Sequence, residues 1–227
     1  MPVRTQSSIT PDVQTIEVFA DVVCPFTHVG LRRLVERRGP DRVEPTLHVR
    51  AWPLEWVNGA PLAAELVAEE IEALQEHVAA DLFGGFDASH FPSTSLPAMT
   101  LAAAAYRRDA RLGERVSLHL RDALFESGRD ISAPDVLAEI AAVHGLDPVA
   151  EVDRDALTVD WDDGRRRGVV GSPYFLLGPD GFFCPSLDID RVDGHLRIVF
   201  DRARFDEFTG RALHHRRTPA GVQGEQV

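Results

Sequence analysis

The chain has 227 residues, and its 36 acidic against 24 basic residues give a formal net charge of −12, which argues against nucleic acid or an anionic membrane as a partner. All 24 basic residues are arginine, so chemistry that needs lysine, such as a pyridoxal Schiff base or a Ser-Lys dyad, is excluded. The two cysteines, Cys24 and Cys184, are too few for a disulfide-stapled scaffold or a four-cysteine zinc site.

The first part of the chain predicts a β-α-β unit. Residues 1–14 are polar and turn-forming, and we expect them to be flexible. Ile16, Val18 and Ala20 alternate with other residues in a short strand that stops at Asp21. A helical pattern follows and ends at Gly39-Pro40, so Cys24 lies at a strand-to-helix junction. Alternation over Glu44–Trp52 predicts a second strand, parallel to the first because a helix connects them.

The middle of the chain is predicted to be helical. Apolar residues recur at helical spacing from Pro61 to Val78 and again over Leu96–Asp109 and Glu114–Glu126, with a loop over residues 82–95. Ser132 with Asp135 three residues later resembles a capping box, which would open a helix closed by Gly145.

The last third predicts a helix, a β-hairpin and a closing helix. The first helix spans Asp155–Arg167, and its acidic cluster around Trp161 is typical of a solvated face. The hairpin joins Pro173–Leu177 to Phe182–Cys184 through a type I turn at residues 178–181. The closing helix covers Arg204–His215. The order β-α-β, helical block, α-β-β-α predicts an α/β domain that carries an all-helical insertion.

Cys24 is the residue on which chemistry most clearly depends. A helix N-terminus favours an anion, so its position should lower the pKa of the thiol and make the thiolate available. The alternative is a buried structural cysteine, which is the commoner role of a lone cysteine.

Three stretches together resemble the DsbA-like branch of the thioredoxin superfamily, especially its cytoplasmic FrnE-like proteins. Residues 21–30, DVVCPFTHVG, resemble the active-site turn of that family, and residues 171–175, GSPYF, resemble its cis-proline loop. The stretch from Leu120 to Asp147 resembles its inserted helical domain.

The resemblance implies a thioredoxin fold with an inserted all-helical domain. The thioredoxin-like domain would be discontinuous, over residues 15–57 and 151–215, with the insertion at 58–150 and flexible termini at 1–14 and 216–227. It further implies that Cys24 attacks disulfides and that Pro173 is cis. The residues assigned to substrate binding are Pro25, Phe26, Ser172 and Pro173.

The chain departs from the family at Thr27, where dithiol members carry a second cysteine. Because a mixed disulfide needs a second thiolate to resolve it, the resolving thiol must come from elsewhere. Three sources stay open: a low-molecular-weight thiol, a cysteine on a partner, or Cys184. Bridging needs Cα atoms roughly 4.4 to 6.8 Å apart, which the sequence does not establish, and a buried unpaired Cys184 beside Phe182 and Phe183 is the favoured alternative.

Thr27 and His28 are the other candidate catalytic residues. The Thr27 hydroxyl, one helical turn past Cys24, would donate to the thiolate or to a bound thiol, unless Thr27 only fills the first turn. A protonated His28 would stabilise the thiolate, but an exposed surface histidine is the favoured interpretation.

The remaining features predict few cofactors. No histidine pair has metal-ligand spacing with carboxylate support, so we expect no metal, and no tightly bound cofactor beyond a low-molecular-weight thiol as co-substrate. The chain lacks an apolar leader or a window long enough to span a membrane, and we expect it in the cytoplasm. Self-association into a homodimer stays open.

The leading hypothesis is therefore a thiol-dependent disulfide oxidoreductase that acts through a single nucleophilic cysteine and a mixed disulfide on a thiol- or disulfide-bearing substrate, including a small molecule. Kappa-class glutathione transferases and hydroxychromene-carboxylate isomerases share the fold and use a bound thiol. They carry serine at the position matching Cys24, which favours the oxidoreductase. A non-catalytic binding module is the third alternative.

Overall fold

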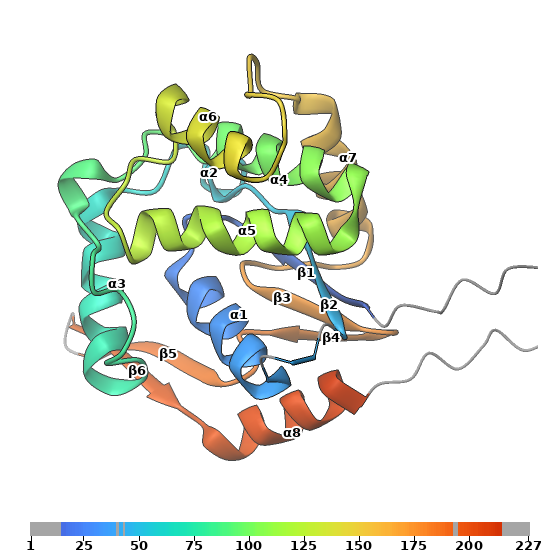
Figure 1. Cartoon of the computed structure of the whole chain (residues 1–227). Coiled ribbons are helices and arrows are strands. Elements are labelled where there is room, and N and C mark those ends of the chain that lie inside the picture. The colour runs from blue at the N-terminus through green and yellow to red at the C-terminus, as the bar shows by residue number, and fades with distance from the viewer. Residues whose placement is uncertain (1–14, 40, 43, 193–194, 215–227) are drawn as a thin grey trace, which may run out of the picture.

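The computed structural model describes residues 15–39, 41–42, 44–192 and 195–214, and the termini expected to be flexible lie outside the described residues. Figure 1 shows a small sheet surrounded by helices. The elements in chain order are β1 Thr15–Ala20, α1 Pro25–Arg38, β2 Thr46–Ala51, α2 Leu54–Asn58, α3 Ala64–His77, a 3-10 turn Ala88–His90, α4 Leu96–Arg108, α5 Ala110–Phe125, α6 Pro134–Val143, α7 Arg154–Arg166, β3 Tyr174–Leu177, β4 Asp180–Phe183, β5 Leu187–Val192, β6 His195–Phe200 and α8 Arg202–His214.

The main sheet has the strand order β2-β1-β3-β4, with β1 and β2 parallel and β3 antiparallel to both of its neighbours. Alternate residues of β1 explain how it is covered. Ile16 and Val18 pack with residues of α1 and α8 on one face, whereas Phe19 packs with Trp52 on the other. The predicted α/β class and the β-α-β unit are therefore confirmed, and helices cover both faces of the central strand.

The hairpin β3–β4 was predicted correctly, but its turn was not. Leu177 pairs with Asp180, so the loop consists of Gly178 and Pro179 rather than of Pro179 and Asp180. Gly178 has φ +63°, a positive value that a type I turn does not allow at this position. Two-residue hairpin loops favour turns with a positive φ at the first loop residue, because the twist of these turns matches that of the strands.

A second hairpin, β5–β6, and the short helix α2 were not predicted from the sequence. The two strands form a separate antiparallel sheet, and β6 contacts α3. Figure 1 shows this hairpin next to α3, at one side of α1. A sequence signal was present, because residues 187–192 and 195–200 alternate around an Asp-Gly pair, which is a strong hairpin signal.

The helical segment shares its core with the rest of the molecule. Buried residues of α3, α4, α5 and α6 form one apolar cluster with Val22, Val23 and Cys24. The predicted capping box is wrong, because the Ser132 hydroxyl donates to the Asp130 carboxylate at 2.6 Å and Ala133 precedes the helix without a side-chain cap. The division at residues 57/58 and 150/151 stays a prediction.

Helical side chains satisfy the free edge of β2. The Leu47 amide donates to Glu114 of α5 at 2.7 Å, and the Ala51 amide donates to Asp160 of α7 at 2.9 Å. Between them the Tyr106 hydroxyl accepts from the Val49 amide at 3.0 Å and donates to the Leu47 carbonyl at 2.8 Å. These bonds occupy groups that would otherwise pair with another strand.

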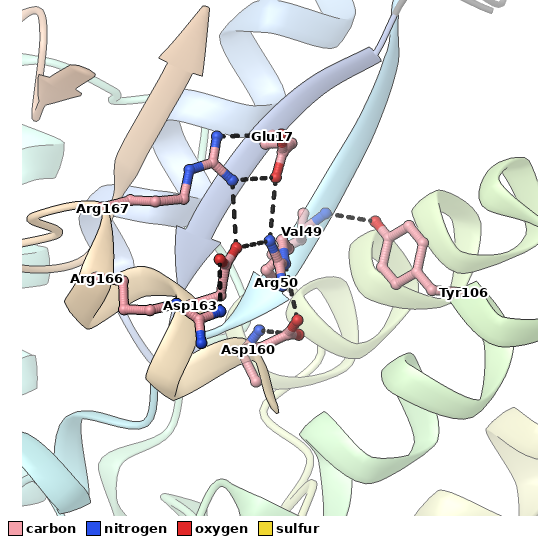
Figure 2. A network of polar contacts seen from close by, with 9 residues as sticks. Glu17, Val49, Arg50, Tyr106, Asp160, Asp163, Arg166 and Arg167 are labelled. Carbon is pink, nitrogen blue, oxygen red and sulfur yellow. Dashed lines mark hydrogen bonds and ion pairs between the residues drawn. The ribbon is translucent and has the colours of Figure 1, made fainter. Parts of the chain in front are cut away.

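Figure 2 shows the polar network that fixes α7 on the sheet. Arg50 of β2 pairs with Asp160, Asp163 and Glu17, and Glu17 also pairs with Arg167. The acidic cluster of α7 is therefore not simply a solvated face, since two of its carboxylates bind Arg50. Gly164 lies where a Cβ would come within 2.7 Å of Trp52, which explains a glycine inside this helix.

Candidate active site

Cys24 lies at the predicted strand-to-helix junction. β1 ends at Ala20, a tight turn follows, and Cys24 is the N-cap of α1, with Pro25 at the first helical position. Its backbone is extended, with φ −81° and ψ 114°, and its carbonyl accepts the His28 amide at 3.2 Å. The thiol therefore stands at the positive end of a helix of 14 residues.

The Ser172-Pro173 loop, 148 residues further along the chain, faces Cys24. The Ser172–Pro173 peptide bond is cis. The Cys24 thiol donates to the Ser172 carbonyl, with 3.3 Å between Sγ and O. The Ser172 hydroxyl accepts from the Asp21 amide at 2.9 Å and lies 3.0 Å from the Thr27 hydroxyl. Ser172 thus joins the loop to both ends of the Cys24 turn.

The environment of Cys24 opposes the expected lowering of its pKa. Only 2% of Cys24 is exposed, and burial raises the pKa of the thiol above its ordinary value. The hydrogen bonds from Ser172 and Thr27 favour the thiolate, but they are weaker than the desolvation. The expectation of a lowered pKa is wrong for this structure, because an apolar surrounding disfavours the charged form more than the helix N-terminus favours it.

Cys24 belongs to a buried apolar cluster that includes residues of three elements far from it in the chain, α3, β5 and β6. Val67, Ile71 and Leu74 of α3 belong to the same buried cluster as Cys24, and so do Leu187 of β5 and Ile198 of β6. Glu70 of α3 is near enough for its negative charge to raise the pKa of Cys24 further. In this structure, called the closed form below, the thiol is shielded from solvent.

The favoured prediction of an exposed, surface His28 is wrong. It is fully buried between Phe83 and Phe125, and its Nε2 lies 2.6 Å from Glu126 Oε1. Burial lowers the pKa of the imidazole, although Glu126 opposes this shift. Glu126 also accepts from the Phe83 and Gly84 amides, so His28 is held by the end of α5 and the adjoining loop.

Cys184 contacts the Ser172-Pro173 loop through its backbone. Its amide donates to the Pro173 carbonyl at 3.2 Å, one residue along from the carbonyl that holds the Cys24 thiol. Both cysteines are buried and free. Burial raises the pKa of Cys184, and the charge of a Cys24 thiolate raises it further. Cys184 is thus buried and unpaired in this structure and near enough to Cys24 for their charges to interact, and whether the two pair on oxidation stays a prediction.

The residues assigned to substrate binding surround this loop. Phe26, Pro173 and Cys184 line the same small cavity, and Pro25 is buried at the start of α1. The structure thus brings together Cys24, Thr27, Pro25, Phe26, Ser172, Pro173 and Cys184, whereas His28 faces Glu126.

Asp21 and Arg121 support the Cys24 turn and were not singled out from the sequence. The Asp21 side chain is 0% exposed and accepts from the Leu54 amide, the Val23 amide and the Ser95 hydroxyl. Burial raises the pKa of Asp21 to about 6. The Asp21 carbonyl accepts from Arg121 at 3.1 Å. The sequence offers a signal for Asp21, because this aspartate lies between apolar residues just before Cys24. No local pattern identifies Arg121.

Within the described residues, no three His, Cys, Asp or Glu side chains are grouped so as to hold a metal ion. None of the helices in that part of the chain is both long and apolar enough to cross a membrane.

The sheet order, the cysteine at the start of α1 and the opposing Ser172-Pro173 loop define a thioredoxin-like protein with a helical insertion. Residues 15–197 match the DSBA-like thioredoxin domain family. The chain belongs to this family and is a thiol-disulfide oxidoreductase-like enzyme.

Solved structures with low sequence identity share the fold. A "probable DsbA oxidoreductase" from Streptomyces coelicolor is 17% identical, with a TM-score of 0.59 over 92% of this chain and 93% of that one. A 2-hydroxychromene-2-carboxylate isomerase is 14% identical, with a TM-score of 0.56 over 75% of this chain and 88% of that one. No curated protein matches the chain.

Proposed function

We propose that this protein catalyses thiol-disulfide exchange with Cys24 as its single nucleophile, through a mixed disulfide. The observation that carries the proposal is the Cys24 thiol at the N-terminus of α1, 3.3 Å from the Ser172 carbonyl of the loop that would receive a substrate. Thr27 takes the place of a second cysteine and instead pairs with the Ser172 hydroxyl, so no thiol stands one helical turn away.

The reaction has two exchange steps. In the first, the Cys24 thiolate attacks one sulfur of a disulfide, and the other sulfur leaves as a thiolate that takes up the proton lost by Cys24. In the second, a low-molecular-weight thiolate attacks the substrate-derived sulfur of the mixed disulfide, which releases a new disulfide and restores Cys24. Electrons only change partners between sulfur atoms, so no tightly bound cofactor is required.

The surrounding residues have distinct roles in this scheme. Thr27 favours the thiolate through its hydroxyl and amide. Pro25, Phe26, Ser172 and Pro173 would contact the substrate next to the sulfur. His28 acts as a positioning residue, because its contact with Glu126 ties α1 to α5. The two free cysteines fit a compartment that keeps thiols reduced, which supports a cytoplasmic location.

A second candidate function is a thiol-dependent isomerase or transferase acting on a small molecule. It is favoured by Thr27, since a protein without a second neighbouring thiol can use a bound thiol as cofactor. In that case the low-molecular-weight thiol would bind saturably even after Cys24→Ser, and no mixed disulfide would form during turnover.

Mass spectrometry after treatment with glutathione disulfide tests the proposal on the wild type, Cys24→Ser and Cys184→Ser. We expect a glutathione adduct on Cys24 in the wild type and in Cys184→Ser, and none on Cys24→Ser. A Cys24–Cys184 disulfide in the wild type would overturn the single-cysteine route and make Cys184 the resolving thiol. Failure of Cys24 to form any mixed disulfide would overturn the exchange route. It would leave the thiol-dependent isomerase or transferase and a non-catalytic binding module, and the burial of Cys24 favours the module.

A further inference from the structure

A second cavity lies behind the Cys24 turn, between the sheet and the helical segment. It has a volume of about 410 Å³, within the usual range of small-ligand sites. Val22 and Val49 line it from the sheet side, and Ala102, Ala103 and Tyr106 line it from α4. The small alanine side chains leave this space open, and neither cysteine lines it.

The cavity has one buried cation at its wall. Arg121 of α5 lines the cavity and is 2% exposed. Its guanidinium donates to the Ser117 carbonyl at 2.9 Å, the Ser117 hydroxyl at 2.7 Å and the Asp21 carbonyl at 3.1 Å, all of which are uncharged. Its Nε has no hydrogen-bond partner within the described residues. The buried Asp21 carboxylate acts on Arg121 electrostatically, but within the described residues no carboxylate hydrogen-bonds to the guanidinium, so this arginine is incompletely matched.

The other arginines that line the cavity are already paired with carboxylates. Arg50 binds Asp160, Asp163 and Glu17, as Figure 2 shows, and Arg107 pairs with Asp153 at 3.2 Å. In the described part of the chain, Arg121 is therefore the cavity-lining arginine without a carboxylate partner. A negatively charged group of a ligand in the cavity would therefore be attracted to Arg121.

We propose that this cavity binds a small amphipathic carboxylate, whose apolar part lies against Ala102, Ala103 and Val49 and whose carboxylate lies toward Arg121. The lining also includes His48, Ser117 and Asp160, and its apolar residues favour a ligand that has an apolar part. A cavity of about 410 Å³ is large enough for a small ligand, such as a carboxylate with a chain of about ten carbons. Neither cysteine lines this site, although Arg121 also donates to the Asp21 carbonyl of the Cys24 turn.

Isothermal titration calorimetry of the full chain with sodium decanoate tests the proposal, with 1-decanol as the uncharged ligand of the same chain length. We expect saturable binding of decanoate that is at least tenfold tighter than binding of 1-decanol. No saturable heat with decanoate, or equal affinity for the two ligands, would overturn the proposal.

Two matched variants locate the site on the structure. Ala103→Leu fills the cavity from α4 and should weaken decanoate binding at least tenfold. Ala104→Leu changes the adjacent alanine, which is not among the cavity-lining residues, and should bind as the wild type does. Circular dichroism confirms that each variant is folded. Equal affinity of the two variants would show that decanoate binds elsewhere and would overturn the assignment.

Discussion

At the scale of single residues, the reactivity of Cys24 depends on a balance between burial and hydrogen bonding. The thiol donates to the Ser172 carbonyl, which favours the protonated form, whereas the side chains of Ser172 and Thr27 favour the thiolate. Desolvation is the largest effect, and it raises the pKa. In the closed form Cys24 is therefore a protonated thiol, and a thiolate needs either opening of the cover or a substrate that excludes the carbonyl contact.

The Thr27 hydroxyl provides a direct test of this balance. Thr27→Val removes the contact at 3.0 Å from the Ser172 hydroxyl and should cost about 1–3 kcal/mol of unfolding free energy. It should also raise the pKa of Cys24 further, whereas Thr27→Ser keeps the hydroxyl and should resemble the wild type. The Cys24 ¹³Cβ chemical shift against pH, in a Cys184→Ser background, reports the pKa. A Cys24 pKa below its ordinary value in the wild type would contradict the account.

Asp21 should make stability fall as the pH rises. Its pKa is about 6 in the folded protein against an ordinary value of 3.8, so the folded state holds the proton between these values while the unfolded state loses it. The folded state thus binds more protons, and the unfolding free energy decreases from about pH 4 to pH 6. A shift of about two pKa units at 1.36 kcal/mol each corresponds to a loss on the order of 3 kcal/mol.

The Asp21→Asn variant isolates this contribution. Asparagine cannot ionise, and its cost in lost acceptor contacts does not change with pH. Urea denaturation at pH 4 and pH 7 should therefore show that the stability of the variant relative to the wild type improves as the pH rises. A relative stability that is the same at both pH values would mean that Asp21 does not hold its proton.

At the scale of elements, the edge of β2 depends on side chains from the helical segment. Tyr106 provides two of these contacts, to Val49 and Leu47. Tyr106→Phe would leave a buried amide and carbonyl without their partner, so we expect a loss of about 1–3 kcal/mol in urea denaturation. Tyr174→Phe is the control, since its hydroxyl makes no hydrogen bond within the described ranges. Equal stability of both variants would show that the β2 edge does not need Tyr106.

The elements with strong local signals could be predicted, and those that depend on distant packing could not. β1, α1 and β2 follow from alternation and from the turn residues around Cys24. β5–β6 has a local signal in its Asp-Gly pair and could have been found. The burial of Cys24 and His28 has no such signal, because the cluster that contains Cys24 includes residues of α3 and the second hairpin, and His28 packs on Phe125 of α5, all far away in the chain. Sequence alone therefore located the cysteine but predicted its pKa in the wrong direction.

At the scale of the whole molecule, we expect access to Cys24 to depend on the contact between α3 and β6. These elements are more than a hundred residues apart in the chain, they contact each other, and apolar side chains of both belong to the buried cluster that contains Cys24. The contact joins a helix to a two-stranded sheet that is separate from the main sheet, so we expect it to open without unfolding the main sheet. Thiol exchange would proceed from that open form.

Weakening this contact should make Cys24 react faster. Ile198 of β6 is 2% exposed and belongs to the cluster that contains Cys24, so Ile198→Ala should destabilise the closed form by about 2–5 kcal/mol. If opening limits the reaction, a loss of only about 1.4 kcal/mol in the stability of the closed form corresponds to a tenfold faster alkylation of Cys24. Ile189→Ala is the matched control, because Ile189 lies opposite Ile198 on β5 but is 39% exposed. Alkylation by iodoacetamide, followed by peptide mapping, should rank Ile198→Ala well above Ile189→Ala and the wild type. Equal rates in the three proteins would mean that Cys24 is reached by another route, and that the cover formed by α3 and β6 does not control its reactivity.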